Sequence, residues 1–169
     1  MLSKFKRSKH QQHLAQLPKL PQTVADVRTL YAPSDFRTTL LDAIANATQR
    51  IYLVALYLEH DDAGREILNA LYQAKQRRPE LEICVLVDWH RAQRGRIGAA
   101  AANTNADWYC AMAGQHPEQS VPIYGVPVNT REALGVLHLK GFVVDDTVIY
   151  SGASINDVYL HQHEKYRYD

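Results

Sequence analysis

The chain has 169 residues, of which 46% are apolar and 22% are charged, and its formal net charge is +1. This length and composition are ordinary for a single soluble globular domain with a substantial core. The longest apolar run, at 51–58, has the length of a buried strand, so no membrane-spanning helix is expected. Cys84 and Cys110 are too few for a disulfide framework and favour a reducing cytoplasm.

Residues 1–30 form a basic lead-in, and residues 31–169 form the expected domain. Five lysines and arginines precede the first acidic residue, Asp26. The segment has no continuous apolar core and no small-residue cleavage site, so it is not a secretory signal. Its charge and its interspersed leucines favour an anionic membrane surface, where each cation adds about 1 kcal/mol. A disordered tail is the alternative, and the same cations would attract other polyanions such as ribosomal RNA.

Helices and strands are predicted to alternate along the rest of the chain. The expected elements are a helix that Ser34 caps, a strand at 51–58, a helix from Asp61 or Asp62 to near Pro79, a strand at 81–87, a helix at 106–112, a strand at 121–125 and a hairpin with strands before and after 145–147. This order predicts an α/β fold with a mostly parallel mixed sheet, flanking helices and a terminal β-hairpin. Sites in such sheets form at the carboxyl ends of strands, where 59–62, 88–96 and the hairpin region should meet.

The loop at 88–96 combines Trp89 with basic residues, namely His90, Arg91, Arg94 and Arg96. Arginine forks suit phosphate oxygens, and an aromatic face can stack on a base. The loop therefore either clamps a nucleotide diphosphate or a lipid headgroup, or is a solvated loop that covers the sheet edge. Nucleic acid is a weaker alternative, because it usually requires a broader basic surface.

The hairpin region contains residues suited to phosphodiester chemistry. His138 and Lys140 are two residues apart in an apolar sequence, so a strand would place both side chains on one face. A histidine can accept a phosphoryl group while cationic and amide groups stabilise its oxygens, which requires no metal or cofactor. For an isolated H-x-K, a core histidine beside a snorkelling lysine is the alternative. Asp145 opens the predicted turn, where an aspartate usually binds backbone amides.

His138, Lys140 and Asp145, followed by a glycine, a serine and an asparagine, form a pattern that resembles the signature of the phospholipase D superfamily. The resemblance implies that His138 is the nucleophile or the acid, that Lys140 binds phosphate and that Asp145 is the motif aspartate. The tail departs from the family pattern by one inserted residue. Ser154 and Asn156 nevertheless keep the S-x-N spacing, and we expect them to bind phosphate.

Family members also place a carboxylate beyond the S-x-N turn, where it orients the histidine. Glu164 or Asp169 would fill that position. His161 and His163 have no further ligands at metal-binding spacing, so a solvated turn is the better interpretation for them.

Longer stretches resemble the bacterial CDP-diacylglycerol–serine O-phosphatidyltransferases, or phosphatidylserine synthases. They lie at 1–7, 54–59, 86–100, 103–110 and 129–138. The resemblance implies phosphatidyl transfer from CDP-diacylglycerol to L-serine through a phosphatidyl-histidine, with release of CMP. It also implies that the sequence is the amino-terminal part of a longer, cytoplasmic enzyme at the inner face of the membrane. The other half would supply a second H-K-D motif, and this half alone should be nearly inactive.

Two other functions stay open at this point. A single motif also fits a phospholipase D-like phosphodiesterase or nuclease, in which two identical chains self-associate to supply both histidines. A non-catalytic module that binds membranes or ribosomes through the basic lead-in is the third interpretation.

Overall fold

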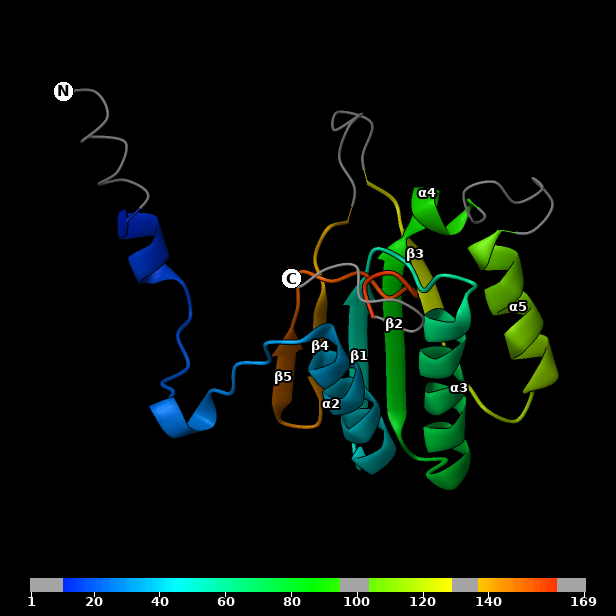
Figure 1. Cartoon of the computed structure of the whole chain (residues 1–169), viewed down its shortest axis with the longest axis horizontal. Coiled ribbons are helices and arrows are strands. Elements are labelled where there is room, and N and C mark those ends of the chain that lie inside the picture. The colour runs from blue at the N-terminus through cyan, green and yellow to red at the C-terminus, as the bar shows by residue number, and fades with distance from the viewer. Residues whose placement is uncertain (1–10, 95–103, 129–136, 161–169) are drawn as a thin grey trace.

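The computed structural model describes residues 11–94, 104–128 and 137–160 (Figure 1). Residues 11–16 are helical. The elements that follow are η1 (Val24–Asp26), α2 (Pro33–Asn46), β1 (Arg50–Ala55), α3 (Asp62–Arg77), β2 (Glu82–Asp88), α4 (Trp89–Ala92), α5 (Asn105–Gln115), β3 (Ile123–Val126), β4 (Gly141–Val144) and β5 (Thr147–Tyr150). Among the described helices, none is both long and apolar enough to span a membrane.

The five strands form one mixed sheet in the order β3-β2-β1-β4-β5. β1, β2 and β3 are parallel, whereas β4 is antiparallel to β1 and to β5. Gly141 at the start of β4 therefore pairs with Val54 near the end of β1, and also with Tyr150 at the end of β5. The sequence-based prediction of an α/β fold with a parallel core and a terminal hairpin is confirmed.

Different segments of the chain lie at the two edges of the sheet where the strands begin and end. The carboxyl ends of β1, β2, β3 and β5 and the amino end of β4 lie together at what we call the carboxyl edge. The amino end of β1 and the β4–β5 turn lie at the opposite, amino edge. In Figure 1, α4 and the red segment at 151–160 are both at the carboxyl edge.

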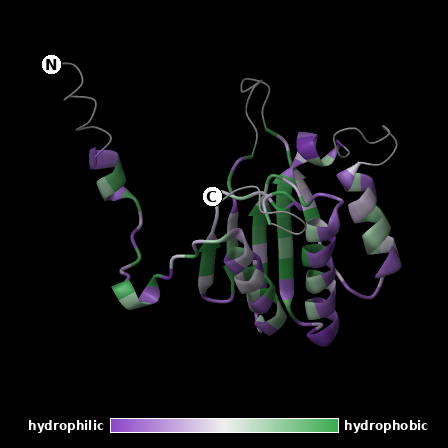
Figure 2. Ribbon diagram, viewed as in Figure 1, coloured by the Kyte–Doolittle hydropathy of each residue, from purple (hydrophilic) through white to green (hydrophobic). Residues whose placement is uncertain are grey.

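α2 and α3 lie side by side across one face of the sheet (Figure 1). β1 and β2 are hydrophobic along most of their length (Figure 2), but only alternate residues are fully buried in β1. The buried helix residues include Leu40 and Ile44 from α2 and Ile67 and Leu71 from α3, which recur at helical spacing. The two helices therefore cover the face to which Ile51, Leu53 and Val85 contribute.

Three local predictions differ from the structure. α2 begins at Pro33, with Ala32 as its N-cap, because proline suits the first helical position, so Ser34 lies in the first turn instead. The basic loop begins with the short helix α4, which was not predicted. Leu137–Lys140 is not part of a strand, since β4 begins only at Gly141.

The N-cap of α3 is Asp61, one of the two predicted residues. Its Oδ1 atom accepts a hydrogen bond from the Gly64 amide at 2.9 Å. A Cβ at Gly64 would lie 1.8 Å from the carbonyl oxygen of Glu59, so only glycine allows this close approach. The first turn of α3 therefore packs directly on the segment that leaves β1.

Candidate functional site

Segments from distant parts of the sequence meet at the carboxyl edge. Beyond β1, Leu58 forms a parallel bridge with Ile155, and the Glu59 amide donates to the Ile155 carbonyl at 3.2 Å. At the end of β2, the Asp88 amide donates to the Leu56 carbonyl at 3.1 Å, and the Leu137 amide donates to the Asp88 carboxylate at 2.9 Å. The predicted convergence of strand ends is therefore present.

His138 and Lys140 lie side by side at this edge, with very different exposure. The His138 side chain is exposed, whereas Lys140 is only 7% exposed. The Lys140 ammonium donates to the backbone carbonyl of His138 at 3.4 Å, and the Lys140 carbonyl accepts a hydrogen bond from the Ser151 amide at 3.3 Å. The His138 imidazole is thus accessible to a substrate, and the Lys140 ammonium lies beside the His138 backbone carbonyl.

Ser154 and Asn156 lie at the same edge, on the segment that Ile155 joins to β1. Ser154 is buried and Asn156 is half-buried. The Oδ1 atom of Asn156 accepts a hydrogen bond from the Tyr159 amide at 3.0 Å, so this oxygen stabilises the following turn. With the inserted residue present, Ile155 still pairs with Leu58 beyond β1, and this pairing places Ser154 and Asn156 at the carboxyl edge.

Tyr57 is a site residue that the sequence reasoning did not single out. It is half-buried, and it lies close enough to the Asn156 side chain for that amide to act on its pKa. Burial and the nearby Glu59 carboxylate raise the pKa of Tyr57, an effect that Asn156 and the Arg91 charge oppose. The phenol therefore stays protonated at neutral pH and can donate a hydrogen bond. A tyrosine among the apolar residues of the predicted strand at 51–58 was the available signal.

The residues of the basic loop differ in burial and in their proximity to Tyr57. Arg91 is half-buried and close enough to Tyr57 to influence its titration, whereas His90 and Arg94 are exposed. Trp89 packs on β3, since a Cβ at Gly125 would lie 2.7 Å from its ring. The structure thus brings Arg91 and Asn156 together around Tyr57. Arg96, Glu164 and Asp169 lie outside the described residues.

α5 supports the segment that leaves β1 from another side. The Tyr109 hydroxyl donates to the Leu58 carbonyl at 2.6 Å and accepts from the Leu58 amide at 2.9 Å. The Asn105 side chain accepts a hydrogen bond from the His60 amide at 3.0 Å. Burial raises the pKa of the Tyr109 phenol, so this two-way hydrogen bond persists at alkaline pH.

Asp145, which the family resemblance groups with the catalytic residues His138 and Lys140, lies apart from these side chains. It lies at the amino edge, where its carboxylate accepts hydrogen bonds from the amides of Thr48, Gln49 and Arg50 at 2.7–3.0 Å and from the Thr48 hydroxyl at 2.9 Å. These bonds, with the Arg50 amide first, hold the pKa of Asp145 well below its usual range. Its backbone has a positive φ of 49°, which aspartate tolerates in turns. The residue fastens the hairpin turn to the start of β1.

We predict that Asp145→Asn lowers the stability of the chain by about 1–3 kcal/mol at pH 7, because an amide replaces one accepting oxygen with a donor. The folded-state pKa of Asp145 is depressed. Its contribution is therefore present above the unfolded pKa of about 3.9 and is lost as the pH falls through the folded value. Urea unfolding at pH 7 and pH 3 should show a smaller difference between variant and parent at the lower pH. Asp146→Asn is the control, since that exposed side chain makes only a surface ion pair with Arg50. Equal losses in the two variants would contradict the assignment.

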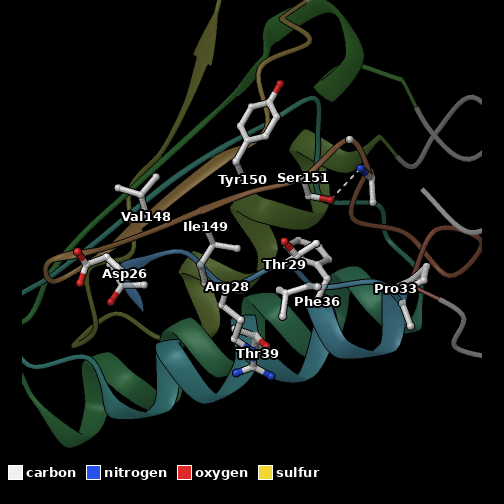
Figure 3. A pocket seen from close by; sticks show the side chains of 15 residues that line it. Asp26, Arg28, Thr29, Pro33, Phe36, Thr39, Val148, Ile149, Tyr150 and Ser151 are labelled. Atoms are coloured by element: carbon white, nitrogen blue, oxygen red, sulfur yellow. Dashed lines mark hydrogen bonds between the residues drawn. The ribbon is translucent and has the colours of Figure 1, made fainter. Parts of the chain in front are cut away.

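A separate pocket of about 550 Å³ lies between the lead-in, α2 and β5 (Figure 3). Phe36 and Ile149 contribute apolar surface, and Asp26 and Arg28 contribute charge. Ser151 lies at the same pocket, and its hydroxyl oxygen accepts a hydrogen bond from the Ala153 amide at 2.9 Å (Figure 3). His138 and Lys140 do not line this pocket, so it is distinct from the site at the carboxyl edge.

No cluster of three or more histidine, cysteine, aspartate or glutamate side chains suited to a metal ion occurs in the described part of the chain. The groups that the carboxyl edge offers to an anion are the Lys140 ammonium, the Arg91 guanidinium, the Tyr57 hydroxyl and the Asn156 amide. Together with an exposed imidazole, this set suits a phosphate ester.

The class that this fold and site define is the phospholipase D-like domain. Residues 40–157 match the family described as cardiolipin synthase, phospholipase D-like domain, and the chain belongs to this family.

The chain is also similar to two curated synthases. It is 75% identical over 169 residues to the CDP-diacylglycerol–serine O-phosphatidyltransferase PssA of Escherichia coli. It is 52% identical over 171 aligned positions to the corresponding transferase of Haemophilus influenzae. The whole chain is covered in both alignments, but it spans only 38% and 37% of these relatives.

A crystal structure of phosphatidylserine synthase from Haemophilus influenzae matches the chain with a TM-score of 0.84 and 50% identity. The match covers 96% of this chain and 36% of that one. The similarity in sequence and the similarity in fold thus extend over nearly the same share of the longer relatives.

Proposed function

We propose that the chain supplies one half of the active site of a CDP-diacylglycerol–serine O-phosphatidyltransferase, with His138 as the nucleophile. The observation that carries the proposal is the exposed His138 imidazole beside the nearly buried Lys140 ammonium at the carboxyl edge. The 75% identity to the Escherichia coli synthase supports the choice of substrates.

The reaction proceeds in two displacements at one phosphorus atom. An imidazole nitrogen of His138 attacks the phosphorus that bears diacylglycerol, and a P–N bond forms as the P–O bond to CMP breaks. The hydroxyl of L-serine then attacks the same phosphorus, so a P–O bond replaces the P–N bond. The hydroxyl proton passes to a base, a role we assign to the histidine of a second H-K-D motif in the other half of the enzyme. The products are CMP and phosphatidylserine; water in place of serine gives phosphatidic acid.

The neighbouring polar groups stabilise the charge on the non-bridging phosphate oxygens. Lys140 supplies a cation from a nearly dry environment, where its field is weakly screened. Asn156 and Tyr57 supply neutral donors from the segment beyond β5 and from the end of β1. Ser154 lies on the same segment as Asn156 and completes the phosphate-binding group.

The basic loop and the last residues of the chain have supporting roles in this proposal. Arg91 is close enough to Tyr57 to lower the pKa of that phenol, and we assign His90, Arg94 and Arg96 to binding of the leaving CMP. Glu164 or Asp169 orients the His138 imidazole as a buried carboxylate does.

The lead-in at 1–30 places the enzyme on the anionic inner face of the cytoplasmic membrane. Leu14, Leu17 and Leu20 are exposed by 60%, 45% and 83%, and basic residues surround them in the sequence. Apolar side chains among cations are typical of segments that bind a lipid surface. Binding to ribosomal RNA would use the same cations without the leucines.

The test is an exchange reaction in a chimera, in which this sequence replaces the matching segment of the Escherichia coli synthase. A covalent intermediate predicts that labelled CMP is incorporated into CDP-diacylglycerol in the complete absence of serine. Exchange that requires serine would contradict a two-displacement mechanism. A homodimeric phosphodiesterase would instead show activity for the 169-residue chain alone, in a stable dimer.

A further inference from the structure

A buried aspartate is the N-cap of the helix that follows each of the first two parallel strands. Asp61 follows β1 and is 6% exposed, and Asp88 ends β2 and is fully buried. One oxygen of each carboxylate accepts a hydrogen bond from the amide three residues later: Gly64 at 2.9 Å for Asp61, and Arg91 at 2.8 Å for Asp88. This is ordinary N-capping, for which a single oxygen is enough.

The second oxygen of each carboxylate binds an amide that is distant in sequence. Asp88 accepts from Leu137 at 2.9 Å, and Asp61 accepts from Asp157 at 2.7 Å. Leu137 directly precedes His138, and Asp157 directly follows Asn156. The two aspartates thus hold the two segments that contain the motif residues.

Asp88 is also joined to the segment that leaves β1. Its amide donates to the carbonyl of Leu56, the residue before Tyr57. The hydrogen bonds of this single residue therefore fix the backbone of Arg91, and the backbone adjacent to Tyr57 and to His138. All three neighbours are residues that the proposed function uses.

A carboxylate at this position needs a reason beyond helix capping. Burying a charge is costly, and a serine or asparagine would cap α4 without that cost. Within the described part of the chain, no ion pair involves Asp88. What an ionised carboxylate offers instead is two accepting oxygens and no donor, so that it can satisfy the amides of Arg91 and Leu137 together.

We infer that Asp88 is a positioning residue, which sets the place of the His138 imidazole relative to Arg91 and Tyr57. Asp61 does the same for the segment with Ser154 and Asn156. The inference rests on the proposed function, because His138 is the nucleophile there. In-line attack is sensitive to geometry, and a displacement of about 1 Å can cost roughly 100-fold in rate.

The test compares Asp88→Asn with Asp61→Asn and Asp146→Asn in the chimera. In Asp88→Asn, an amide group faces two N–H donors with only one oxygen. We expect the rate of CMP release in a single turnover to fall roughly 100-fold, with a change of no more than about threefold in the KM for CDP-diacylglycerol. Asp61→Asn should mainly raise this KM, because it displaces the phosphate-binding segment, and Asp146→Asn at the amino edge should change neither value.

A measurement that does not depend on activity distinguishes failure of this inference from failure of the proposed function. Hydrogen exchange on the 169-residue chain should be faster at the Leu137 amide in Asp88→Asn, with α2 protected as in the parent. A single-turnover rate within twofold of the parent, in an enzyme that His138→Asn inactivates, would overturn the inference and leave the proposed function intact. Unchanged exchange at Leu137 would overturn it whatever the activity. Loss of α2 protection as well would show a general structural role and would also overturn it.

Discussion

His138→Asn in the chimera should reduce CMP release by on the order of 10⁴-fold or more, because the side-chain amide is too weak a nucleophile to form the P–N bond. The substitution keeps a polar group of similar size at an exposed position. The stability of the fold should therefore change by no more than about 0.5 kcal/mol. The affinity for CDP-diacylglycerol should also persist, since Lys140, Asn156 and Tyr57 are intact.

The measurement is CMP release and lipid binding by parent and variant, with thermal unfolding as the check on folding. His90→Asn is the matched comparison, because His90 is an exposed histidine at the same edge. It should weaken binding of CDP-diacylglycerol with little effect on the rate at saturation. If His138→Asn retained a tenth of the parent rate, His138 would not be the nucleophile.

Lys140→Met should lower the activity of the enzyme without lowering its stability. Lys140 is only 7% exposed, and its one hydrogen bond within the described residues is to the His138 carbonyl at 3.4 Å. An ammonium group has three donors, so this environment satisfies it incompletely until an anion binds. Methionine has a similar length and no charge to bury. The variant should therefore be as stable as the parent or more so, while the rate at saturation falls roughly 10²- to 10³-fold.

Lys75→Met is the matched control for this prediction. The Lys75 ammonium donates to the carbonyls of Pro79 and Leu81 at 2.6 and 2.7 Å, beyond the end of α3 and away from the carboxyl edge. Its loss should reduce stability and leave CMP release unchanged. Destabilisation in Lys140→Met instead, with activity in proportion to the folded fraction, would mean that Lys140 is a structural residue.

Periodicity was sufficient to predict the sheet. The apolar runs that became β1 and β2, separated by a predicted helix, favour parallel strands with a crossover helix, and the strand ends then meet at one edge. His138 and Lys140 were singled out from their spacing together with the resemblance to the phospholipase D signature, and their catalytic roles stay predictions. Their placement just before β4, rather than within it, could not be predicted in this way, because it depends on long-range hydrogen bonds from the Leu137 amide to Asp88 and from the Ser151 amide to the Lys140 carbonyl.

The long-range roles of aspartates were beyond sequence reasoning. Asp145 was expected to hold amides, but those of Thr48, Gln49 and Arg50 are about a hundred residues away in sequence. Asp88 was recognised only as the first residue of a basic loop. α4 is a single turn, so no apolar periodicity marked the helix that Asp88 caps.

The most direct test of the central claim is to locate the covalent intermediate. The chimera would be mixed with CDP-diacylglycerol labelled in the phosphate that bears diacylglycerol, quenched under alkaline denaturing conditions that preserve phosphoramidates, and digested for peptide mapping. We expect the label on the peptide that contains His138, in the parent and in Asp146→Asn but not in His138→Asn. Label on a histidine of the other half, or on no histidine at all, would contradict the assignment of His138 as the nucleophile.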